Sequence, residues 1–178
     1  MGTTIALAIR LLVPLTILRW PLASGVLSIA ADTIDIVIFN VWGFPSWGYQ
    51  EFDKALDLYY LALEAIVVQR WAGFERGVAS ALFLWRLLGV ALFELTGWRA
   101  TLLVFPNVFE LYYLLVLGVR RFVPAYELTP ARTAAWLPAL LVPKLAQEYL
   151  LHYARVLDDL VLFDVIEDWW SRLRDAAG

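Results

Sequence analysis

The amino-acid sequence predicts an all-α fold: a multi-pass membrane protein with a bundle of about six transmembrane helices and a C-terminal amphipathic helix. Of its 178 residues, 62% are hydrophobic and 17% are charged, whereas soluble domains are about 45–50% apolar and about 25% charged. The apolar residues are gathered in long continuous runs, most of which approach the roughly 20 residues that a helix needs to cross a bilayer. We therefore expect the protein in the cell (inner or plasma) membrane, with membrane lipids as its surroundings.

The breaks between the apolar runs set the expected helix ends. Pro21 cannot continue a preceding helix but suits the first turn of the next one. The glycines and proline of residues 43–48 indicate a loop, and Pro106 is expected to kink the fifth helix. The predicted membrane helices are residues 5–18, 22–42, 50–70, 77–95, 100–119 and 131–153. A chain of this length predicts a single transmembrane domain over residues 1–178.

The last part of the chain has a different pattern. Between residues 156 and 174, apolar side chains such as Leu157, Leu160 and Val161 alternate with acidic ones such as Asp158 and Asp159. This pattern is typical of a helix that lies along a membrane surface, although its acidity disfavours anionic headgroups. The same segment is equally suited to docking on the protein itself.

Counts of single residue types exclude several classes of function. The chain has no cysteine and one histidine, His152, which excludes disulfides, thiolate zinc sites and iron–sulfur clusters. Its net charge is −3, and no basic stripe could follow a phosphate backbone. Nucleic acid is therefore not an expected partner.

Ionisable side chains inside the apolar runs are the main candidates for function, because charges within hydrocarbon usually face a bundle interior or a wet cavity. The candidates chosen from the second to the sixth expected helix are Asp32, Asp35, Asp53, Asp57, Glu64, Arg86, Glu94, Glu110, Lys144 and Glu148.

Four of these acids occur as two closely spaced pairs. Asp32 and Asp35 are three residues apart, and Asp53 and Asp57 are four apart, so each pair lies on one face of its helix. A short loop joins the two helices, which predicts that the pairs converge toward one membrane face. Four carboxylates at close quarters need protons or cations to neutralise them. All-oxygen ligands favour a hard divalent ion, Mg²⁺ or Mn²⁺ among them.

The same four aspartates resemble the CDP-alcohol phosphotransferase family. Its signature of four aspartates straddles the second and third membrane helices, and Asp32, Asp35, Asp53 and Asp57 occupy all four positions. The resemblance implies that all four belong to a divalent-metal site and that Asp57 is the catalytic base. It further implies transfer of a phosphoalcohol group from a CDP-linked donor to a hydroxyl, in phospholipid headgroup chemistry.

Four positions depart from that signature. Ile36 and Tyr49 stand where the family has glycine, and Phe39-Asn40 stands where it has an Ala-Arg pair, whose arginine would grip a phosphate. The sequence therefore leaves open whether the chain is a metal-dependent transferase for another substrate or a catalytically inactive relative.

Two other functions remain open beside the transferase. The first is a cation or proton-coupled transporter or channel that uses the same carboxylates together with Glu64 and Glu110. The second is a noncatalytic subunit of a larger membrane complex, in which intramembrane charges pair across helices and chains. A homodimer or a complex with other membrane subunits is compatible with all three.

The remaining charged residues predict either an ion path or a structural network. Glu64 follows Asp57 by two turns and is expected either to extend a path into the bundle or to pair with Arg86 or Lys144. Arg86, Glu94 and Glu110 are expected to form a network, and Asn107 and Glu110 to line a cavity at the Pro106 kink. Lys144 and Glu148 complete the charged residues of the sixth helix.

The arginines between the expected helices indicate an orientation. Six lie in loops or helix ends on the same predicted side of the membrane: Arg19, Arg70, Arg76, Arg120, Arg121 and Arg132. The positive-inside rule places that side in the cytoplasm and the four aspartates on the other side.

Overall fold

The computed structural model describes residues 2–30, 46–98 and 100–149. Helices joined by short connections account for these residues, and no strand occurs among them. The all-α prediction is therefore confirmed for this part of the chain. Asp32 and Asp35 and the predicted amphipathic segment 156–174 lie outside the described residues.

The N-terminal helix is α1, Gly2–Leu15, and it continues into a single 3-10 turn, η1, Thr16–Leu18. The chain then reverses, and a second apolar helical segment spans Pro21–Ala30. Pro21 begins this segment as expected, since its fixed φ suits a first helical turn. The hydroxyl groups of Thr16 and Ser24 hydrogen bond at 2.7 Å and connect the two sides of the reversal.

The next helix, α3, spans Ser46–Val68 and begins four residues before the expected start at Gln50. Residues 46–48 were expected in a loop, but they form its first turn. A single glycine, Gly48, costs a helix only about 1 kcal/mol and does not end it.

Glycines at both ends of helix α4, Phe74–Thr96, explain its limits. Gly73 has φ 74° and Gly97 has φ 66°, in the left-handed region that side chains with a Cβ rarely adopt. The helix begins three residues earlier than the sequence pattern predicted, directly after Gly73.

The expected fifth helix is divided in two, as the kink prediction requires. Helix α5, Ala100–Val104, ends before Pro106, and α6, Val108–Phe122, begins after Asn107. Helix α5 packs closely on α4: a Cβ added at Gly89 would stand 2.2 Å from the Cβ of Phe105. The last described helix is α7, Pro130–Glu148, which contains Pro138 and Pro143.

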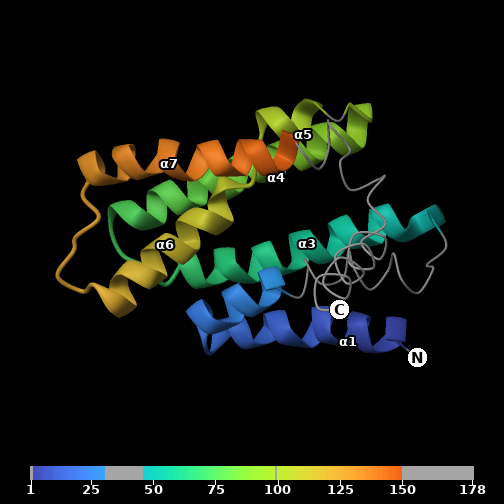
Figure 1. Ribbon diagram of the computed structural model, residues 1–178, viewed down its shortest axis with the longest axis horizontal. Helices are drawn as coiled ribbons and strands as arrows, with labels where there is room; N and C mark the ends of the chain where they lie inside the picture. The colour runs from blue at the N-terminus through green and yellow to red at the C-terminus, as the bar shows by residue number, and fades with distance from the viewer. Residues whose placement is uncertain (1, 31–45, 99, 150–178) are drawn as a thin grey trace, which may run out of the picture.

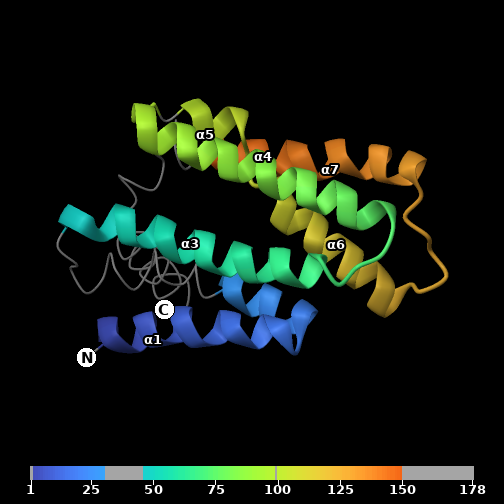
Figure 2. The ribbon, with the colours of Figure 1, turned by 180° about the vertical axis from the view of Figure 1, so that it is seen from behind.

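The helices form two layers with α6 crossing between them (Figure 1). Helices α1 and α3 and the segment Pro21–Ala30 lie in one layer, and α4, α5 and α7 lie in the other; the reverse view shows the same arrangement (Figure 2). The buried core lies where α3, α6 and η1 meet, with Leu61, Val68, Phe109, Tyr113 and Ile17 almost completely covered. The rings of Trp71 and Tyr113 stack there at 5.7 Å between centroids.

Two helical stretches, Phe74–Thr96 and Ala100–Phe122, are long and apolar enough to cross a membrane. Helix α4 exposes large apolar side chains along its length, including Leu84, Trp85, Leu88 and Leu95. Contiguous apolar exposure of this kind is rare on a soluble monomer and suits contact with lipid.

Candidate functional site

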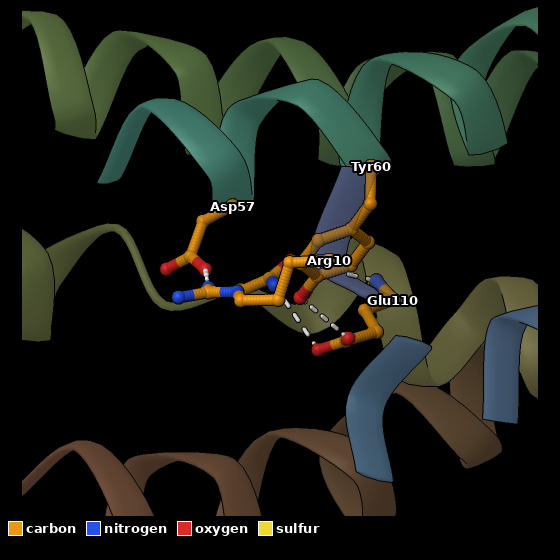
Figure 3. Close-up of polar contacts among 5 residues, drawn as sticks. Arg10, Asp57, Tyr60 and Glu110 are labelled. Atoms are coloured by element: carbon orange, nitrogen blue, oxygen red, sulfur yellow. Dashed lines mark hydrogen bonds and ion pairs between the residues drawn. The ribbon is translucent and has the colours of Figure 1, made fainter. Parts of the chain in front are cut away.

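The most distinctive polar region of the described structure is a group of carboxyl groups on α3 and α6 that are partly or fully buried. On α3, Asp57, Tyr60 and Glu64 follow each other at intervals of three and four residues and therefore share one face of the helix. From α6, Glu110 points toward the same region. Figure 3 shows Asp57, Tyr60 and Glu110 together with Arg10 of α1.

Arg10 forms an ion pair with Asp57. Its Nη2 atom lies 2.9 Å from the Oδ1 atom of Asp57 (Figure 3), and its side chain is only 5% exposed against 32% for Asp57. This contact fastens α1 to α3. Arg10 was not among the predicted site residues. Its position inside the first apolar run could have indicated that it has an acidic partner.

Glu110 is buried and fully engaged in hydrogen bonds. The hydroxyl group of Tyr60 donates to its Oε1 atom at 2.7 Å, and the Nδ2 atom of Asn107 donates to its Oε2 atom at 3.2 Å. Asn107 is also the N-cap of α6, where its Oδ1 atom accepts from the backbone N–H of Glu110 at 3.5 Å. Asn107 therefore caps α6, and the Glu110 carboxyl group in turn accepts from the Asn107 side chain; we call this pair of contacts the reciprocal cap, which differs from a capping box in using the side-chain amide and not the backbone N–H of the cap residue.

Glu64 differs from Glu110. Its side chain is 0% exposed, and neither carboxyl oxygen has a hydrogen-bond partner among the residues that the structure describes. Among the described residues, the expected pair with Arg86 or Lys144 does not form. Arg86 instead donates to the carbonyl oxygen of Phe105, and Lys144 donates to Gln147.

Three helices enclose the Glu64 carboxyl group. A Cβ added at Gly25 would lie 3.3 Å from the Oε1 atom of Glu64, and equally close to the ring of Tyr113. The carboxyl group of Glu64 is therefore packed against the bare backbone of the segment Pro21–Ala30 and against α6. Ser28, one turn after Gly25, has a buried hydroxyl oxygen that also lacks a hydrogen-bond partner.

The other predicted site residues lie apart from this region or outside the description. Glu94 is exposed on α4, and the side chains of Asp53 and Glu148 lie outside what the structure describes. Within the described part of the chain, no three acidic or histidine side chains are grouped so that they could hold a metal ion. The predicted four-aspartate metal site remains a prediction, since two of its members lie beyond the described residues.

No family model, curated protein or solved structure matches this chain. The resemblance to the CDP-alcohol phosphotransferases consequently rests on the spacing of the four aspartates.

Proposed function

We propose that the protein is a multi-pass membrane protein that binds and releases a proton at Glu64, within a proton-coupled transporter or a proton-conducting path. The observation that carries this proposal is the complete burial of the Glu64 carboxyl group without a hydrogen-bond partner in the described part of the chain. Burial of an uncompensated charge is very costly, and ionisable groups inside membrane bundles are accordingly tied to ion or proton handling.

A proton fits this place better than a metal ion does. Mg²⁺ and Ca²⁺ need six or more oxygen ligands, usually several of them carboxylates. A Cβ added at Gly25 would meet the Glu64 carboxyl group, Leu114 and Tyr113 together, so apolar and aromatic side chains lie at this place. A single proton neutralises a carboxylate without any further ligand.

The neighbouring polar groups suggest where the proton would enter. Asp57 is partly exposed, whereas Tyr60 and Glu64, the next residues on its face of α3, are buried. The Tyr60 hydroxyl is hydrogen bonded to Glu110. Asp57 is thus the carboxylate at the accessible end of this row, and Glu64 is at its inner end.

Placement in a bilayer with about six spanning helices is part of the same proposal. It is supported by the six apolar runs of the sequence and by the two stretches long enough to cross a membrane. In this placement the row from Asp57 to Glu64 lies within the bilayer, where a protonated carboxyl group is far less costly than an ionised one.

The first test is proton movement in liposomes that contain the purified protein and a trapped pH-sensitive dye. After a pH jump or a potassium diffusion potential, we expect Glu64→Gln to lower the protein-dependent proton flux at least about tenfold, since glutamine keeps the shape but cannot exchange a proton. Glu127→Gln, which changes an exposed acid between α6 and α7, is the control and should leave the flux unchanged.

Infrared difference spectroscopy makes the test independent of a transported substrate. A protonated carboxyl group has its own carbonyl band, which we expect in the wild type and not in Glu64→Gln. If the wild type and Glu64→Gln had the same carbonyl band and the same proton flux, Glu64 would not be a proton site.

A second candidate is metal-dependent phosphoalcohol transfer, which the spacing of the four aspartates favours. Asp57 lies on α3 with a partly exposed carboxylate, as an acceptor-activating base requires. Thermal unfolding in detergent with Mg²⁺ or Mn²⁺ tests it: binding to the folded state must raise stability. The candidate predicts a stabilisation that disappears in the Asp35→Asn, Asp53→Asn double variant. Equal melting curves with and without each ion would remove the metal site from consideration.

A further inference from the structure

Six arginines gather at one end of the bundle. In Figures 1 and 2, the end of η1, the ends of α3 and α6, and the starts of α4 and α7 all lie at the end of the molecule away from the N-terminus. These segments contain Arg19, Arg70, Arg76, Arg120, Arg121 and Arg132, against two acidic residues, Glu75 and Glu127. The fold therefore brings to one end of the bundle the six arginines that the sequence analysis assigned to one side of the membrane.

Three of the six arginines have structural contacts. Arg70 donates to the carbonyl oxygen of Leu18 at 2.9 Å, which fastens α3 to η1. Arg120 pairs with Glu75 at 2.7 Å and lies 4.8 Å from the ring centre of Trp71.

Arg132 completes this group. It donates to the carbonyl oxygen of Glu127 at 2.8 Å and covers the ring of Tyr126 at 4.5 Å. Of the two acidic side chains at this end, that of Glu75 pairs with Arg120.

The remaining three arginines are exposed: Arg19, Arg76 and Arg121. Their guanidinium groups make no hydrogen bond or ion pair with any residue that the structure describes. Surplus positive charge therefore remains on the surface after the structural contacts are made.

Large apolar side chains are exposed at the same end. Trp20 follows Arg19 and is 61% exposed, and Phe122 follows Arg121 and is 75% exposed. Phe74 and Trp136, near the starts of α4 and α7, are exposed as well. Aromatic side chains beside arginines are typical of the membrane–water interface, where the ring enters the acyl boundary and the guanidinium stays at headgroup level.

We propose that this arginine end binds the phosphate groups of anionic phospholipids, through Arg19, Arg76 and Arg121. Each basic residue near an anionic surface contributes favourably to its binding, and guanidinium groups match phosphate oxygens in pairs. The adjoining aromatic side chains favour a lipid surface over an acidic protein, because they need an apolar partner beside the phosphates. The arginine end then faces the anionic cytoplasmic leaflet.

The full-length protein in nanodiscs tests this proposal. We compare its thermal unfolding in phosphatidylglycerol with that in phosphatidylcholine of equal chain length, at low salt. The anionic lipid should raise the midpoint by several degrees, since a ligand of the folded state stabilises it. The R19Q/R76Q/R121Q variant should lose at least half of this shift, and Lys144→Gln, which removes a positive charge on the C-terminal half of α7, should keep it.

Two further comparisons make the result decisive. The R19K/R76K/R121K variant retains the charges and should retain most of the shift. With the wild type alone, about 0.5 M salt should largely remove the shift, because the Debye length falls to a few ångströms. Equal midpoints in the two lipids would overturn the proposal, and so would an undiminished shift in the glutamine variant. Equal midpoints are also the outcome expected if the acidic segment 156–174 of the chain occupies this end.

Discussion

Glu110 and Glu64 are two buried acids in one bundle, and they differ in every contact that their carboxyl groups make. Glu110 accepts hydrogen bonds from Tyr60 and Asn107 and completes the cap of α6. Glu64 lies against Gly25 and aromatic side chains and has no hydrogen-bond partner. Among the described residues, no hydrogen bond requires a carboxyl group at position 64, and an apolar side chain would fill this space at lower cost. The comparison separates an acid whose hydrogen bonds hold the fold from one for which we propose a role in function.

The largest effect on stability is expected at Glu110. Glu110→Ala leaves the Tyr60 hydroxyl and the Asn107 amide buried without their acceptor and removes part of the helix cap. We expect a loss of about 2–3 kcal/mol in the free energy of unfolding. Denaturant titration in mixed micelles, followed by tryptophan fluorescence, measures it. A loss below about 0.5 kcal/mol would mean that these hydrogen bonds do not hold the fold.

The same measurement on Glu64 should give the opposite sign. Glu64→Leu removes a polar group that has no partner to lose and replaces it by an apolar side chain of similar size. We expect the free energy of unfolding to rise by about 1 kcal/mol. A strong destabilisation would show that Glu64 has a structural role, and the contrast with Glu110 would fail.

An effect of similar size is expected at the glycine that faces Glu64. In Gly25→Ala the new methyl group would lie 3.2–3.3 Å from Leu114, Tyr113 and the Glu64 carboxyl group, which costs about 1 kcal/mol of overpacking. Gly118→Ala on α6 is the matched control, because nothing lies within 4 Å of its added Cβ. Glu64→Ala should relieve part of the cost in the double variant. Additive effects would argue that the two residues are not in contact.

A comparable effect is expected at Tyr60. Tyr60→Phe removes one hydrogen bond to Glu110 and should cost about 1 kcal/mol. In the Glu110→Ala background the same change should cost less, since the Glu110 acceptor is already gone. A cost that persists in that background would assign it to packing of the ring and not to the hydrogen bond.

The sequence predicted the features that depend on neighbouring residues. Pro106 placed the break between α5 and α6, and the reciprocal cap of Asn107 and Glu110 could also have been predicted from the Asn-x-x-Glu spacing. The start of α3 was missed because a glycine near a helix end does not by itself mark a loop.

The sequence did not predict which side chains of distant segments would contact each other. Arg10 and Asp57 are 47 residues apart, and their contact depends on how α1 and α3 are rotated about their axes. The same rotation turns Glu64 toward Gly25 and not toward Arg86 or Lys144. Periodicity shows which residues share a face of one helix, but only packing decides which face of another helix they meet.

The close approach of α5 to α4 at Gly89 gives a criterion for recognising relatives of this chain. A Cβ at position 89 would overlap Phe105, so a chain that keeps this contact must keep glycine there or shift the short helix. The Phe-Pro-Asn-x-x-Glu motif of residues 105–110 follows, and it combines the packed ring, the break and the cap. Relatives can therefore be sought by a glycine that is followed, at the same separation, by this motif. Such a search does not depend on the residues at other positions, including the four aspartates.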